Sequence, residues 1–135
     1  MNGIIIYWSE TGNTESMAMR IKDDTNFKCV RVENISADDA LKYDKIVLGC
    51  PAMGAEELEE ATFRPFFDEI LAKLTNQKVF LFGSYGWGGG EYMTLWENEF
   101  DHNKNNLAAK GICGCGDASS FDENEYEQFI NYINN

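Results

Sequence analysis

A six-residue stretch rich in hydroxyl and amide side chains directly follows the first apolar run of the chain: Ser9, Glu10, Thr11, Gly12, Asn13 and Thr14. Between a buried strand and a helix, such a turn directs backbone N–H groups and the positive end of the helix dipole at an anion. The stretch contains no Lys or Arg, so it lacks the lysine of a Walker-type loop. It predicts a site for a monophosphate held by hydroxyls and amides, rather than for a nucleoside triphosphate with its magnesium ion.

Two further loops have the composition of a ligand site. The second contains Pro51, Ala52, Met53, Gly54, Ala55 and Glu56, and the third contains Ser84, Tyr85, Gly86, Trp87, Gly88, Gly89 and Gly90. An indole on a glycine-rich loop beside a crevice can stack on a planar ring. Taken alone, the third loop favours a tryptophan that packs into the core. The three loops together favour a ligand with a phosphate at one end and a flat ring at the other.

The elements that must position these loops alternate along the chain. Apolar runs predict three central strands, at residues 4–8, 45–50 and 78–83, and weaker runs predict edge strands, at residues 28–32 and 107–114. Helical spacing of apolar residues predicts helices after residue 14 and over residues 63–74, 91–104 and 123–133. This alternation predicts an α/β fold: a three-layer, doubly wound, five-stranded parallel sheet in the order 2-1-3-4-5. In that topology all three loops lie at the carboxyl edge of the sheet.

Two helices carry more specific signals. In the helix over 91–104, Tyr92, Leu95 and Trp96 are expected to be buried. The last helix has Asp122 and Glu125 at the spacing of a capping box, which predicts its first turn.

Composition restricts the class of partner. The chain has 135 residues and a formal net charge of −12, a field that repels nucleic acid and anionic membranes and favours partners with basic patches. We see neither a basic leader nor an apolar segment of 18 residues. The expectation is one domain over residues 1–135, monomeric and cytoplasmic. The four cysteines are expected to be mostly small buried thiols; Cys113 and Cys115, as a lone Cys-x-Cys pair, are a poor metal signal, and no metal is expected.

The three loops closely resemble the flavodoxin family, specifically its short-chain clostridial-type members. The matching segments are Tyr-Trp-Ser-x-Thr-Gly-Asn-Thr-Glu at 7–15, Leu-Gly-Cys-Pro-Ala-Met-Gly-x-Glu at 48–56 and Leu-Phe-Gly-Ser-Tyr-Gly-Trp-Gly at 81–88. Flavodoxin itself exemplifies the predicted strand order. The resemblance implies a low-potential one-electron carrier with one noncovalently bound FMN, which shuttles electrons between redox enzymes and turns over no substrate of its own.

The resemblance also implies a role for each loop. Residues 9–14 would hold the FMN phosphate, and the cofactor-binding set would extend over residues 51–56 and 84–89. Trp87 would stack on the outer face of the isoalloxazine ring and Met53 would lie against its inner face. Glu56 would accept a hydrogen bond from N3–H, and the Gly54 carbonyl would meet N5–H of the neutral semiquinone after the following peptide rotates. Backbone amides of the third loop would meet the O2 side of the ring.

The chain departs from this family at a few positions. Glu10 stands where close relatives often have glycine; its carboxylate is expected to point to solvent, because it would repel the phosphate. Ala55 follows the glycine of the rotating peptide, and an alanine there would disfavour a loop that needs positive φ at that position. Residues 111–120 match the family poorly.

Two other functions compete with the carrier. One is an FMN-dependent NAD(P)H:quinone oxidoreductase, although hydride transfer needs a nicotinamide flat on the flavin, where Trp87 would cover one face. The other is a module of the same fold dedicated to activating one partner enzyme.

Overall fold

The computed structural model describes residues 2–54, 57–86 and 89–135. Its five strands are β1 (Gly3–Tyr7), β2 (Lys28–Arg31), β3 (Lys45–Gly49), β4 (Lys78–Ser84) and β5 (Ile112–Gly114). They form one parallel sheet in the order β2-β1-β3-β4-β5. The predicted fold class and strand order are therefore confirmed.

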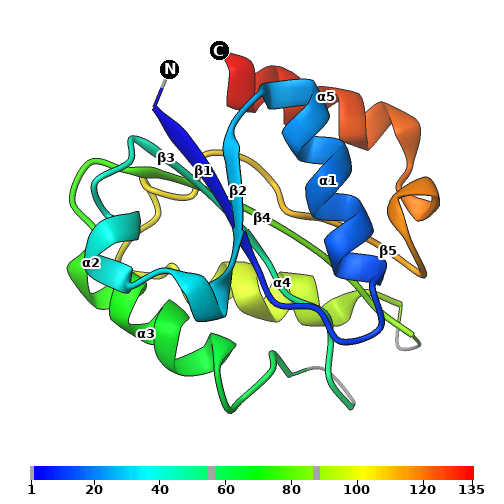
Figure 1. Cartoon of the computed structure of the whole chain (residues 1–135), viewed down its shortest axis with the longest axis horizontal. Helices are drawn as coiled ribbons and strands as arrows, with labels where there is room; N and C mark the ends of the chain where they lie inside the picture. The colour runs from blue at the N-terminus through cyan, green and yellow to red at the C-terminus, as the bar shows by residue number, and fades with distance from the viewer. Residues whose placement is uncertain (1, 55–56, 87–88) are drawn as a thin grey trace.

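Helices cover both faces of the sheet (Figure 1). One face carries α1 (Asn13–Thr25) and α5 (Glu123–Asn134), and the other carries α2 (Ala37–Ala40), α3 (Phe63–Lys73) and α4 (Glu91–Asn98). Two short 3-10 helices, Val32–Asn34 and Ala118–Ser120, complete the connections. Among the residues described, we find no helix that is both long and apolar enough to cross a bilayer.

The core has two layers because successive strand side chains point to opposite faces. Ile4 and Ile6 pack with α2, α3 and α4, whereas Ile5 packs with α1 and α5. In the first layer, the buried Trp96 ring lies edge-on to two phenylalanines of α3, at centroid distances of 5.6 and 5.7 Å. These layers fix the strands whose carboxyl ends carry the three loops.

The predicted end of the fourth helix was wrong, as was one buried side chain. The helix predicted over 91–104 ends at Asn98. Leu95 is 49% exposed, whereas Tyr92, Met93 and Trp96 are buried. A helix turns by about 100° per residue, so the stripe that includes Met93 leaves Leu95 on the opposite side.

The fifth strand is shorter than the predicted 107–114. Leu107 makes only an isolated bridge to Val79, and the regular strand covers Ile112–Gly114. The chain leaves the sheet between these points because the Gly111 N–H donates to a Glu97 carboxylate oxygen, at 2.6 Å, rather than to β4.

Two smaller predictions have mixed outcomes. The Asp122 carboxylate accepts from the Glu125 N–H at 3.0 Å, as the capping signal predicted. Of the cysteines, only Cys50 is fully buried, and Cys115 is exposed. Cys115 lies beyond the short β5, where the chain no longer has a sheet neighbour to cover it.

Candidate functional site

A cleft of about 300 Å³ lies at the carboxyl ends of β1, β3 and β4. Residues from all three predicted loops line it: Ser9, Glu10, Thr11, Asn13, Thr14, Pro51, Ala52, Met53, Ser84, Tyr85 and Gly86, together with Trp8. Clefts of about 410 and 440 Å³ occur elsewhere, near the amino ends of the strands. Convergence of separate loops, rather than volume, therefore singles out this cleft.

The remaining predicted residues divide into two groups. Gly12, Gly54 and Gly89 lie in the same loops and have positive φ angles of 102°, 59° and 69°, a conformation that glycine adopts without strain. Ala55, Glu56, Trp87 and Gly88 lie outside the described residues, so the roles assigned to them stay predictions.

Ser9 organises the first loop. Its hydroxyl oxygen accepts from the Gly12 and Glu15 N–H groups, each at 3.2 Å, and the residue is buried. Gly12, at the N-cap position of α1, has no side chain to cap the helix, and Ser9 supplies this cap from three residues upstream. The loop is thereby tied to the start of the helix.

The same loop presents a cluster of unused donors. Five backbone N–H groups of residues 9–14 have no acceptor among the described residues, those of Ser9, Glu10, Thr11, Asn13 and Thr14. Because they belong to the turn and to the first residues of α1, they carry the positive end of the helix dipole. Glu10 is the one charged side chain among the described residues that line the cleft, and it is exposed. An anion here would be bound by amides.

Buried polar contacts connect the first loop to the third. The Thr14 and Ser84 hydroxyls lie 3.0 Å apart, and both residues are buried. The Ser84 carbonyl accepts from the Ala52 N–H at 2.9 Å, which joins the second loop to the same residue. The three loops are therefore one connected unit.

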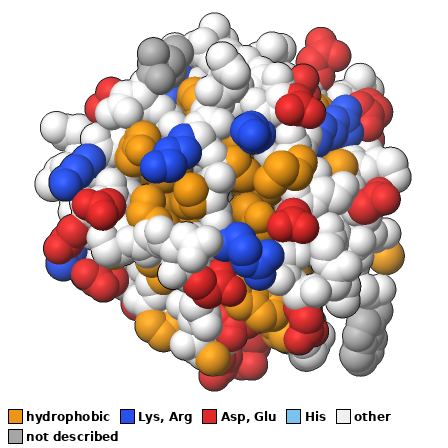
Figure 2. Space-filling model, viewed as in Figure 1, with side chains coloured by type: hydrophobic (Ala, Val, Ile, Leu, Met, Phe, Trp, Pro, Cys, Tyr) orange, Lys and Arg blue, Asp and Glu red, His pale blue; other side chains and the backbone are white. Residues whose placement is uncertain are grey.

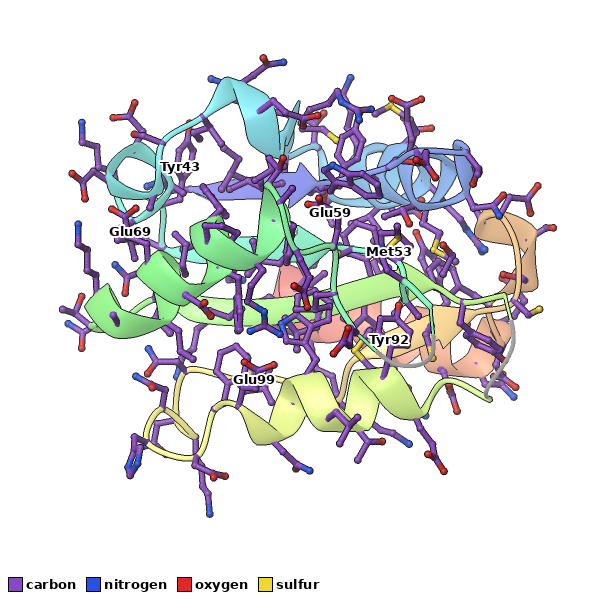
Figure 3. The ribbon with its side chains drawn as sticks, turned by 90° about the horizontal axis from the view of Figure 1, so that it is seen from below. Tyr43, Met53, Glu59, Glu69, Tyr92 and Glu99 are labelled. Carbon is purple, nitrogen blue, oxygen red and sulfur yellow. The ribbon has the colours of Figure 1, made fainter. Side chains whose placement is uncertain are left out.

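The second loop closes on itself between Met53 and Glu57. The Met53 N–H donates to the Glu57 carbonyl at 2.6 Å, and the reverse bond measures 3.4 Å. Figure 3 shows Met53 and Glu59 on this connection between β3 and α3. These two bonds join the described ends of the loop.

Glu59 anchors the far end of that connection. Its carboxylate accepts from three backbone N–H groups at the start of α3, those of Ala61, Thr62 and Phe63, at 2.9, 2.9 and 2.6 Å. Its own N–H donates to the Cys50 sulfur at 3.4 Å, and burial raises the pKa of that thiol to about 12. Cys50 is therefore a neutral packing thiol beneath the loop.

Tyr92 links α4 to the end of β3, where the second loop begins (Figure 3). Its hydroxyl donates to the Cys50 carbonyl at 3.1 Å, and burial raises its pKa well above the usual value. A Cβ on Gly83 would lie 2.1 Å from that carbonyl and 2.3 Å from the hydroxyl oxygen, so only glycine fits here.

Sequence reasoning missed two residues at the site. Trp8 was assigned to the end of the first strand, yet it lines the cleft. Arg31 donates from Nη2 to the Ser9 carbonyl oxygen at 2.7 Å. Its position follows from the register of β2 on β1, which pairs Tyr7 with Arg31. The register of two strands cannot be predicted from the residues next to Arg31 in the sequence.

These features fit FMN. The unpaired amides suit a phosphate, and the side chains of Trp8, Met53 and Tyr85 provide apolar and aromatic wall for a flat ring. The cleft opens at the carboxyl ends of parallel strands, where ligands of doubly wound sheets bind.

Comparisons with known proteins agree with this geometry. The family model described as Flavodoxin matches residues 5–130. A flavodoxin from Megasphaera elsdenii is 50% identical over 98 residues, covering 69% of this chain and 72% of that protein. A flavodoxin from Clostridium beijerinckii is 44% identical over 102 residues, covering 72% and 74%. The solution structure of two-electron reduced Megasphaera elsdenii flavodoxin superposes with a TM-score of 0.77, at 38% identity and 98% coverage of both chains.

Proposed function

The chain belongs to the flavodoxin family, and we propose that the three loops at the carboxyl edge of its sheet hold the FMN through which it transfers electrons. It is an FMN-binding electron carrier that exchanges electrons with redox partner proteins, not an enzyme with its own substrate. When bound, FMN supplies the redox chemistry. The observation that carries the assignment of the site is the cleft lined by all three loops.

In this proposal the first loop binds the phosphate. Its five unpaired N–H groups among the described residues support that role, and the Ser9 hydroxyl holds the turn in the conformation that presents them. Met53 would lie against the inner face of the ring, Trp87 would stack on its outer face and Glu56 would accept from N3–H. The last two assignments rest on the family pattern alone.

We propose that the redox partners dock through basic patches. The chain carries a net charge of −12. On the face over β2, Lys and Arg side chains lie among hydrophobic ones, and Asp and Glu side chains lie between and around them (Figure 2). Charge steering of this kind weakens as the Debye length falls from about 30 Å at 0.01 M to about 8 Å at 0.15 M. Electron transfer from the reduced, FMN-loaded chain to a basic haem protein such as cytochrome c should therefore slow as salt is added. A rate independent of salt would refute this partner class.

Two proposals concern the chain as a whole. Residues 1–135 would form one FMN-binding domain, because one sheet receives every strand described, and this domain would act as a monomer. A cytoplasmic location suits the four cysteines, which are all free thiols.

The site is tested by titrating the apoprotein with FMN and with riboflavin, which lacks the phosphate. Stacking and exclusion from water should quench flavin fluorescence at one flavin per chain. FMN should bind at least tenfold more tightly than riboflavin. Equal affinities would refute the assignment of the first loop to the phosphate.

A further inference from the structure

The proposed phosphate loop, residues 9–14, contains no Lys or Arg, but the side chain of Arg31 contacts its backbone from β2. Arg31, at the end of the edge strand β2, donates from Nη2 to the Ser9 carbonyl oxygen at 2.7 Å. Its guanidinium also lies 3.6 Å from a carboxylate oxygen of Glu15 and 3.5 Å from one of Glu33. Within the described residues, Ser9 contributes the one backbone carbonyl that this side chain contacts.

We propose that Arg31 is a positioning residue that orients the Ser9–Glu10 peptide and thereby makes the site select flavins that carry a phosphate. In a trans peptide the C=O and the following N–H point in opposite directions. When Arg31 holds the Ser9 carbonyl on the β2 side, the Glu10 N–H is turned the other way, toward the cleft. That N–H has no acceptor among the described residues.

The side chain of Arg31 is itself held in place. The Tyr7 hydroxyl donates to Glu15 at 2.7 Å, the same carboxylate oxygen that faces Arg31, and the guanidinium lies 5.4 Å from the centre of the Tyr7 ring. Glu15 returns to the loop through its N–H, which donates to the Ser9 hydroxyl. These contacts connect β1, β2, α1 and the first loop to one another. The Arg31 side chain therefore has little conformational freedom left to lose when the phosphate binds.

Arg31 has a second effect through its charge. Glu15 and Glu33 place two carboxylates behind a turn that must receive a dianion, and Arg31 offsets them. A hydrogen bond from a guanidinium also polarises the peptide that accepts it, which strengthens the N–H at the opposite end. Both effects act on the phosphate and not on the ring.

A purely structural role would have a different consequence. Charged residues are common on edge strands, where they discourage pairing with other chains. If Arg31 served only the stability of β2, its loss would weaken binding of any flavin equally. The ratio of FMN to riboflavin affinity therefore separates the two roles.

The experiment compares Arg31→Gln and Arg31→Lys with the unmodified chain. Lys28→Gln is the matched control, because Lys28 is exposed on the same strand and its substitution makes the same change in net charge. The dissociation constants of FMN and riboflavin are measured by fluorescence quenching, and thermal unfolding of each apoprotein is recorded. For Arg31→Gln, the FMN dissociation constant should rise about tenfold, equivalent to about 1.4 kcal/mol. The riboflavin constant should stay within twofold.

The remaining variants make the test decisive. Arg31→Lys keeps the charge and one donor, so it should recover at least half of the lost affinity on a logarithmic scale, and Lys28→Gln should change neither constant by more than twofold. An equal loss for FMN and riboflavin, or a lysine variant as weak as the glutamine variant, would overturn the proposal. If Arg31→Gln does not fold, Arg31→Met, which keeps an unbranched side chain beside the Tyr7 ring, takes its place under the same criteria: a tenfold rise in the FMN constant with the riboflavin constant within twofold supports the proposal, and equal losses for both flavins overturn it.

The inference rests on the proposed phosphate site. The assignment of that site would be refuted separately, by an unmodified chain that binds FMN no more tightly than riboflavin.

Discussion

Replacing Glu59 with glutamine tests how strongly one buried carboxylate supports the connection that carries Met53. The two carboxylate oxygens accept three N–H groups at the start of α3, and Thr62, at the N-cap position, makes no side-chain cap of its own. Glutamine has a single acceptor oxygen. In either orientation of its amide, an NH₂ group faces at least one backbone N–H, so that buried donors are left opposed.

The cost follows from the number of bonds affected. A buried donor left without a partner costs about 1–3 kcal/mol, and the surviving bonds lose their charge assistance. We expect Glu59→Gln to reduce the free energy of unfolding by about 2–3 kcal/mol. For a domain of this size, that corresponds to a fall in Tm of about 6–15 °C.

The assay is urea unfolding of the apoprotein, followed by circular dichroism and by tryptophan fluorescence. Glu60→Gln is the matched control, since Glu60 is the next residue, is exposed and loses the same charge; it should lie within about 0.5 kcal/mol of the unmodified chain. A loss below about 1 kcal/mol for Glu59→Gln, or an equal loss for both variants, would show that the carboxylate does not cap α3 as described.

Other substitutions test the cleft and the thiols. Ser9→Ala leaves the Gly12 and Glu15 N–H groups without their acceptor, and it should raise the FMN dissociation constant at least tenfold in a fluorescence titration. Glu10→Gln should change that constant by less than tenfold, because the Glu10 side chain is exposed; a much tighter complex would contradict this. At pH 8 a thiol reagent should modify the exposed Cys115 but not Cys50, whose pKa burial raises to about 12, until the chain is unfolded. Added salt should leave FMN affinity unchanged or increase it, measured by the same titration, because salt screens the repulsion from a chain of charge −12.

The strands of the sheet could be predicted because burial on both faces requires apolar side chains at successive positions. The run at 45–50 is apolar at nearly every position, and its neighbours in the sheet are equally apolar. Such runs indicate central strands whatever the composition of the adjoining loops. The loops could then be placed at one edge by topology alone, which is why most of the cleft was anticipated.

The features that escaped prediction depend on packing between distant segments. Leu95 and Met93 are equally apolar, and only the position of α4 on the sheet decides that Met93 is buried. Gly111 leaves the sheet because a Glu97 carboxylate on α4 takes its N–H. Arg31 reaches Ser9 through the register of β2. Each depends on a partner that periodicity along the chain does not identify.

A loop without lysine or arginine can hold a dianion in this acidic chain because short-range donors act more strongly than distant charges. A carboxylate about 10 Å away opposes each negative charge of the phosphate by about 0.4 kcal/mol where water intervenes. Each hydrogen bond from an N–H to a charged acceptor contributes about 1.5–3 kcal/mol. A few of the unpaired N–H groups of this loop therefore outweigh several exposed carboxylates. In the proposed arrangement Arg31 lies behind the Ser9–Glu10 peptide, so it would strengthen a donor without adding a positive charge to the lining of the cleft.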